Sequence, residues 1–184
     1  MLTIGKWSLM VAAGLVALVA GVDCRADEGA NKLSQDLYTV LERFHGHTCA
    51  GSLMGARLGL AARAALERAG VEGKLKAQCY SLSCPVDGIQ VMAGTTYGNR
   101  ALEVQDRGEH RLVLSDEKSG HQVEARITTG AMEKASGSRE MAKQARSLPV
   151  GSPERKKLEQ ELDALYTWLK TAPETEVVTV KPLR

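Results

Sequence analysis

The chain has 184 residues, of which 43% are hydrophobic, 25% charged and 4% aromatic, with a net charge of +2. This length and apolar content suit one globular domain and argue against a disordered chain. The 24 basic side chains are nearly balanced by 22 acidic ones. Because the sequence also has no Lys/Arg block and no aromatic platform, we expect no nucleic-acid partner. Four cysteines and four histidines in a chain with one Phe direct attention to metal or thiol chemistry.

The first 26 residues have the pattern of an export signal. A short basic start ends at Lys6, an uncharged run rich in Leu, Val and Ala covers 7–22, and small side chains precede a cleavage point after Ala26. The run is shorter than the about 20 apolar residues of a spanning helix, so cleavage is favoured over an uncleaved anchor. A lipid anchor on Cys24 is a third alternative, disfavoured by its neighbour Asp23.

We therefore expect a signal peptide at 1–26 and one exported domain at 27–184. The expected location is the bacterial periplasm, with membrane contact only through the signal during export. Loss of Cys24 would leave Cys49, Cys79 and Cys84, an odd number for a disulfide framework in an oxidising compartment. At least one thiol therefore needs another purpose, such as holding a metal.

The spacing of apolar residues predicts the elements of the rest of the chain. Helices are expected at Lys32–Phe44, Ser52–Ala69, Pro85–Ala93, Ala131–Arg146 and Pro153–Lys170. Strands are expected at Leu75–Leu82, Ala101–Gln105, Arg111–Ser115, Gln122–Thr128 and Glu176–Val180. This order predicts the α+β class: a helix-strand-helix-three-strand core with one mixed sheet covered by helices, plus C-terminal helices.

Two imidazoles and a thiol lie within five residues between the first two helices, at His45, His47 and Cys49. In an extended stretch these three side chains share one face, because side chains alternate with period two. Imidazole nitrogen and thiolate sulfur are the donors that zinc prefers. Cys49 also stands near the start of a helix, where the helix dipole favours the thiolate. The alternative is two ordinary loop histidines and a small buried cysteine.

A second thiol, Cys84, precedes Pro85 at the start of the next helix. Together with the first group it predicts a metal site formed by His45, His47, Cys49 and Cys84. Asp87, in the first turn of that helix, is either a partner of the helix dipole or a candidate base for a zinc-bound water. Cys79 lies in the middle of a predicted strand, where we expect a buried core residue. A Cys79–Cys84 disulfide is an alternative that competes with the metal.

Gly51, Gly55 and Gly59 recur every four residues along the second predicted helix. Because each interior glycine costs a helix about 1 kcal/mol, we expect a neighbouring helix, in the same chain or a second copy of it, or a ligand to approach this face closely. Arg57 on this helix either reaches toward the His/Cys group and binds an anion or forms a surface salt bridge. The polar loop 94–99 is suited to shaping a pocket. His110 and His121 are expected at the surface.

Four ordered motifs resemble the family of the formylmethanofuran dehydrogenase E protein. They are His45-Gly-His-Thr-Cys-Ala-Gly51, Gly55-Ala-Arg57, Cys84-Pro-Val-Asp-Gly-Ile-Gln90 and Gly94-Thr-Thr-Tyr-Gly98. The resemblance covers about Leu33 to Val180 and implies an α+β core and a metal-binding protein, often with zinc and often dimeric. It places His45, His47, Cys49 and Cys84 on a groove, with Asp87 nearby and Arg57, Gln90 and Tyr97 as cofactor-binding candidates. Many relatives carry a C-terminal cysteine-rich zinc module, whereas this chain has no cysteine after Cys84.

The leading expectation is an exported protein that binds a metal ion or a small metallo-cofactor through its His/Cys site and forms a homodimer. The cofactor is zinc or another transition metal; haem is a further candidate because His and Cys both serve as axial ligands. Covalent c-type haem is excluded, since no Cys-x-x-Cys-His is present. The rival is a zinc-dependent enzyme that activates water in the same groove. A structural zinc and, less favoured, a thiol redox enzyme are the remaining alternatives.

Overall fold

The structure is a computed structural model that describes residues 36–183. The expected signal segment 1–26 and the start of the first expected helix lie outside this range, whose first element is helical over 36–45. The elements that follow are α2 (Ala50–Arg68), β1 (Leu75–Cys79), α3 (Pro85–Ala93), β2 (Leu102–Val104), β3 (Arg111–Asp116), β4 (Gln122–Ile127), α4 (Thr129–Ala135), α5 (Ser138–Ser147), α6 (Pro153–Thr171), α7 (Glu174–Val177) and β5 (Val178–Pro182).

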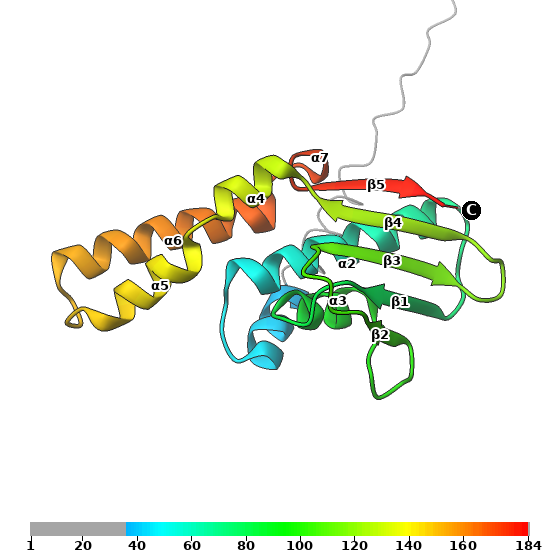
Figure 1. Ribbon diagram of the computed structural model, residues 1–184, viewed down its shortest axis with the longest axis horizontal. Helices are drawn as coiled ribbons and strands as arrows, with labels where there is room; N and C mark the ends of the chain where they lie inside the picture. The colour runs from blue at the N-terminus through cyan, green and yellow to red at the C-terminus, as the bar shows by residue number, and fades with distance from the viewer. Residues whose placement is uncertain (1–35, 184) are drawn as a thin grey trace, which may run out of the picture.

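The strands form one mixed sheet in the order β2-β1-β3-β4-β5 (Figure 1). β1 and β2 pair in parallel, with α3 between them in the chain, and all other neighbours are antiparallel. Side chains alternate along the strands: Leu112, Leu114 and Ala125 are fully buried, whereas Arg111 and Arg126 lie on the opposite face. The α+β class and the mixed sheet predicted from the sequence are confirmed.

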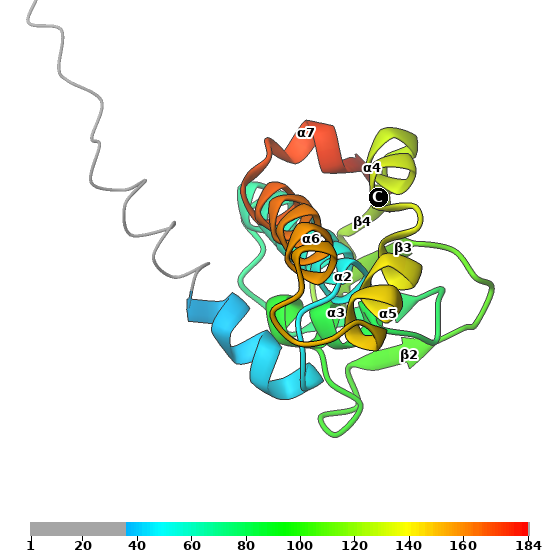
Figure 2. The same ribbon diagram turned by 90° about the vertical axis from the view of Figure 1, so that its left-hand side faces the viewer.

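Helix α2 is the centre of the core. It packs against β3, β4 and β5 on one side and against α3 and α6 on the other. Figure 2 shows α2 between α6 and α3 in a view along α6. Within the described range, no helix is long and apolar enough to cross a membrane.

The glycines of α2 let α3 approach until the two backbones touch. A Cβ added at Gly55 would lie 2.0 Å from the carbonyl oxygen of Pro85, and one added at Gly88 would lie 2.2 Å from that of Ser52. A Cβ at Gly59 would lie 3.0 Å from the Cβ of Met92. The close neighbour expected from the glycine spacing is therefore α3 of the same chain, and this contact sets the N-termini of α2 and α3 side by side.

The predicted helix Ala131–Arg146 is two helices. α4 ends at Ala135, and Gly137 has a φ of +75°, so the chain turns before α5 begins at Ser138. α5 and α6 pack on each other as an antiparallel helical hairpin that extends away from the sheet (Figure 1). β1 ends at Cys79 instead of Leu82, and the expected strand Glu176–Val180 begins as α7 before it becomes β5. The other boundaries within residues 36–183 differ from the prediction by at most two residues.

Candidate metal centre

The two histidines and the first cysteine of the predicted site lie together at the start of α2. One ligand atom from each of His45, His47 and Cys49 lies within 4.8 Å of the others. The helix at 36–45 ends at His45, and Gly46, with a φ of +83°, turns the chain back toward Cys49. The rings of His45 and His47 have centroids 4.5 Å apart. The local sequence thus brings both imidazoles to one thiol.

Cys49 is the N-cap residue of α2. Its sulfur accepts a hydrogen bond from the backbone N–H of Ser52 at 3.4 Å and lies 3.5 Å from the Ser52 hydroxyl. Burial opposes the thiolate, but hydrogen bonds to Ser52, His45 and Cys84 outweigh it and lower the pKa of the Cys49 thiol. Cys49 is therefore prepared to act as an anionic ligand.

His45 is held between a carboxylate and a thiol. Its Nδ1 lies 2.6 Å from Oδ2 of Asp87, and its Nε2 lies 3.6 Å from Sγ of Cys49. Burial favours the neutral ring, but the hydrogen bonds to Asp87 and Cys49 prevail and raise the pKa of His45. When Nδ1–H donates to Asp87, the lone pair of Nε2 points toward the thiol, as in the carboxylate–histidine pairs of metal sites.

Gln90 supports Asp87 from the next turn of α3. Its amide Nε2 donates to Oδ1 of Asp87 at 3.3 Å, and its Oε1 accepts the backbone N–H of Tyr97 at 3.2 Å. A chain of hydrogen bonds therefore runs from the loop at Tyr97 through Gln90 and Asp87 to His45. The Tyr97 ring itself is 81% exposed.

Cys84 lies beside Cys49 at the start of α3. A Cβ added at Gly51 would lie 2.9 Å from the Cβ of Cys84 and 3.8 Å from the sulfur of Cys49, so the two thiols meet across a glycine. Burial and the neighbouring Cys49 raise the pKa of the Cys84 thiol. Cys84 therefore lies next to the group formed by His45, His47 and Cys49. It is not one of the residues whose ligand atoms all lie within 4.8 Å of one another.

Cys79 stands apart from this centre. It is 1% exposed in the core, and its thiol donates to the carbonyl oxygen of Ser81 at 3.5 Å. Cys79 and Cys84 are both free thiols, so the alternative of a disulfide between them is not realised in this structure. The expectation of a buried core cysteine is confirmed.

Arg57 makes a contact other than the two expected from the sequence, which were an approach to the His/Cys group and a surface salt bridge. Its guanidinium donates to the backbone carbonyls of Lys170 at 3.1 Å and Ala172 at 2.6 Å, at the end of α6. These bonds satisfy carbonyls that have no partner within the helix. Arg57 therefore joins α2 to α6.

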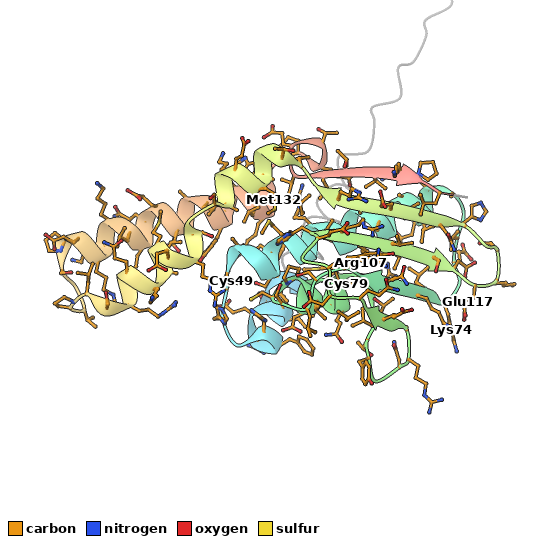
Figure 3. The ribbon with its side chains drawn as sticks, viewed as in Figure 1. Cys49, Lys74, Cys79, Arg107, Glu117 and Met132 are labelled. Carbon is orange, nitrogen blue, oxygen red and sulfur yellow. The ribbon has the colours of Figure 1, made fainter. Side chains whose placement is uncertain are left out.

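A pocket of about 710 Å³ opens beside the thiols, between the core and the α5–α6 hairpin. Its core side includes His47, Cys49 and Cys84, and its hairpin side includes Arg139, Arg146, Leu162 and Tyr166. Burial and the nearby Cys49 raise the pKa of Tyr166, so its hydroxyl stays protonated. Figure 3 places Cys49 where the hairpin leaves the core.

His110 was expected at the surface, and this expectation is wrong. The side chain is half-buried and lines the same pocket, and burial lowers its pKa. The β2–β3 connection carries it there, which no local pattern of the sequence reveals. His121 is exposed, as expected.

The family model "FmdE, Molybdenum formylmethanofuran dehydrogenase operon" matches residues 44–179. The chain belongs to the FmdE family. The match begins just before the histidine pair and ends in β5, so it includes the centre and the hairpin.

A solved FmdE-like structure has a similar fold. It is the crystal structure of a tungsten formylmethanofuran dehydrogenase FmdE-like protein from Syntrophus aciditrophicus. The TM-score is 0.52 at 18% identity, covering 82% of this chain and 72% of the other. No curated protein matches the sequence. The structural likeness supports the fold of this FmdE-family chain.

The separation of one pair of ligand atoms fits a tetrahedral metal ion. Bonds of about 2.0 Å to nitrogen and 2.3 Å to sulfur, at a tetrahedral angle, place two ligand atoms about 3.5 Å apart. The Nε2 of His45 and the Sγ of Cys49 are 3.6 Å apart. The donor set of imidazole and thiol suits zinc and similar transition metals.

Proposed function

We propose that this FmdE-family chain is an exported protein that binds a metal ion or a small metallo-cofactor. His45, His47 and Cys49 are the proposed ligands, with Cys84 as the fourth, and zinc is the first candidate among transition metals. The observation that carries the proposal is the placement of His45, whose Nε2 lies 3.6 Å from Cys49 while Asp87 holds its Nδ1. Neutral imidazole and thiolate are the forms that bind zinc.

A zinc-dependent enzyme is the second candidate, and the pocket beside the centre favours it. A bound zinc ion would supply Lewis-acid activation of a water or carbonyl group. Asp87 is committed to His45 at 2.6 Å, so it serves as a positioning residue in this arrangement, and it would have to leave His45 to act as a base. The present geometry therefore favours binding over catalysis.

Haem remains the alternative cargo, and export and a homodimer are further parts of the proposal. A visible absorption spectrum of protein purified from a periplasmic fraction tests cargo and location together, since haem has an intense Soret band and zinc has none. Light scattering after size exclusion measures the oligomeric state. A cytoplasmic, monomeric protein would contradict these two parts and leave the metal ligands to be tested separately.

Titration with cobalt(II) tests the ligands, because bound cobalt absorbs through its thiolate ligands. We expect the reduced protein to bind one equivalent, with a thiolate charge-transfer band. Cys49→Ser should weaken cobalt binding by at least about tenfold and reduce that band, and Cys84→Ser should do so to a smaller extent. Cys79→Ala is the matched control, because Cys79 lies in the core away from the centre.

The control should leave both the affinity and the band unchanged. Absence of a thiolate band in the wild-type protein would contradict the proposed function. An equal loss of affinity in Cys79→Ala and Cys49→Ser would contradict the assignment of the ligands.

A further inference from the structure

The pocket beside the metal centre has the dimensions of a small-molecule site. Its volume of about 710 Å³ lies within the range of about 300–1,000 Å³ found for such sites. Met54, Pro85, Ala142 and Leu162 supply apolar walls. Cys49 and Cys84 lie on one side, so an occupant would extend from the metal centre toward the hairpin.

One face of α5 lines this pocket and carries two cationic side chains. Arg139, Ala142 and Arg146 are spaced by three and four residues, so they share that face. Within residues 36–183, the guanidinium groups of Arg139 and Arg146 form no ion pair and no hydrogen bond. Both guanidinium groups are therefore available to a ligand.

The acidic side chains of the pocket do not cancel both arginines. Glu159 is paired with Arg155, whose Nε lies 2.7 Å from Oε1. Asp163 is the remaining acid of the lining and is exposed. Two unpaired guanidinium groups face one unpaired carboxylate, which leaves an excess of positive charge on the hairpin side.

We infer that this pocket binds an organic anion with an apolar body, and that Arg139 and Arg146 hold its anionic group while its other end contacts the metal centre. The inference rests on the proposed function, because it requires a metal at His45, His47 and Cys49. Charged hydrogen bonds from guanidinium to a carboxylate or a similar anion are among the stronger polar contacts. The Tyr166 hydroxyl offers a further donor in the same pocket.

Two hydroxamate probes separate the metal contact from the anion contact. Hexanohydroxamic acid and adipic acid monohydroxamate have the same chain length and the same zinc-binding group, and only the second has a carboxylate. Calorimetry first measures zinc binding and then the binding of each probe to the zinc-loaded protein. We expect the carboxylate probe to bind about tenfold more tightly than the neutral one.

The variants assign this difference to the hairpin. Arg139→Gln combined with Arg146→Gln should abolish the preference, and Asp163→Asn should increase it. Lys143→Gln removes one charge from α5 outside the lining of the pocket and should leave the preference unchanged.

Each of the other possible outcomes of this experiment contradicts a part of the inference or of the proposed function. Equal affinity for the two probes, or no binding of either probe to the zinc-loaded protein, would overturn the inference and leave the proposed function standing. Loss of the preference in Lys143→Gln to the same extent as in the arginine variant would also overturn it. A wild-type protein that binds no zinc would overturn the inference and the choice of zinc as the metal of the proposed function.

Discussion

Asp87 fixes the orientation of the His45 ring in the candidate metal centre. It holds the Nδ1 of His45 at 2.6 Å and is itself held by Gln90 at 3.3 Å. Asp87→Asn removes the charge by replacing the carboxylate with an amide of the same shape. We expect metal affinity at pH 7 to fall about 10- to 100-fold, the usual effect of losing a partner of a ligand histidine. Titration with zinc against a competing chelator measures this change.

The same variant has an expected pH signature. Because Asp87 helps to raise the pKa of His45, a proton competes with the metal as the pH falls through that raised value. In Asp87→Asn the pKa of His45 should be lower, so proton competition should begin at a lower pH. Glu117→Gln, at the far end of the sheet (Figure 3), is the control and should follow the wild-type profile. An Asp87→Asn profile identical to that of the wild type would contradict the positioning role.

Local spacing was sufficient to predict part of the site. His45, His47 and Cys49 lie within five residues, so one turn of the chain brings their ligand atoms together. Asp87 was expected to be a base or a helix partner, because its contact with His45 arises only when α3 docks on α2. Arg57 reaches carbonyls more than 110 residues further along the chain, and such a contact has no local signal.

At the scale of the elements, the contact between α2 and α3 holds the two halves of the centre together. A Cβ at Gly55 would meet the Pro85 backbone at 2.0–2.6 Å, and backbone atoms there cannot move without separating the helices. We expect Gly55→Ala to lower the free energy of unfolding by about 3 kcal/mol or more, and to weaken metal binding by displacing Cys84. Urea denaturation measures the first effect.

Gly130→Ala is the matched control for this substitution. Gly130 lies in α4, and a Cβ there would have nothing within 4 Å. Because alanine favours the helix over glycine, this variant should gain about 0.5–1 kcal/mol. A Gly55→Ala protein as stable as the wild type would show that the helices do not need this close approach.

Residues that favour the start or the end of a helix explain which boundaries of the elements could be predicted from the sequence. α3 has the predicted bounds, Pro85–Ala93, because proline suits a helix start and Gly94 ends the helix in the left-handed conformation with a φ of +70°. The break between α4 and α5 was missed because apolar spacing continues past Gly137. Nothing in that pattern distinguishes an interior glycine from one at which the chain turns.

At the scale of the whole molecule, charge pairs hold three strands together on the face of the sheet opposite α2. The Glu124 carboxylate lies 2.8 Å from Arg126, 3.0 Å from Arg111 and 3.1 Å from Lys181. Hydrogen bonding to Arg126, opposed by burial and assisted by Lys181 and Arg111, lowers the pKa of Glu124 to about 2. These cations come from β4, β3 and β5.

Glu124 should therefore stabilise the fold in a pH-dependent way. A carboxylate with a lowered pKa in the folded state contributes fully above its unfolded value of about 4.5, and this contribution is lost as the pH falls toward 2. We expect Glu124→Gln to cost roughly 1–3 kcal/mol at pH 7 and progressively less below pH 4.5. Glu103→Gln, which removes an exposed carboxylate of β2, should change stability by less than about 0.5 kcal/mol. A pH-independent cost for Glu124→Gln would contradict this account.

The hairpin is the part of the molecule that the sequence predicted least well. The helical character of α5 and α6 could be read from their spacing, but their position against the centre depends on the turn at Gly137 and on the bonds of Arg57 to the end of α6. The pocket follows from that position, and the β2–β3 connection adds the half-buried His110 to its lining. The residues that the hairpin and the β2–β3 connection contribute to the pocket were therefore missed, whereas the residues of the His/Cys motif and Cys84 at the start of α3 were predicted.

The most direct test of the central claim is zinc X-ray absorption on the purified, zinc-loaded protein. If His45, His47, Cys49 and Cys84 bind the ion, the first shell should contain two sulfur atoms at about 2.3 Å and two nitrogen atoms at about 2.0 Å. Cys49→Ser should reduce the sulfur contribution to one atom, and Cys79→Ala should leave it at two. A first shell of oxygen and nitrogen without sulfur in the wild-type protein would contradict the claim.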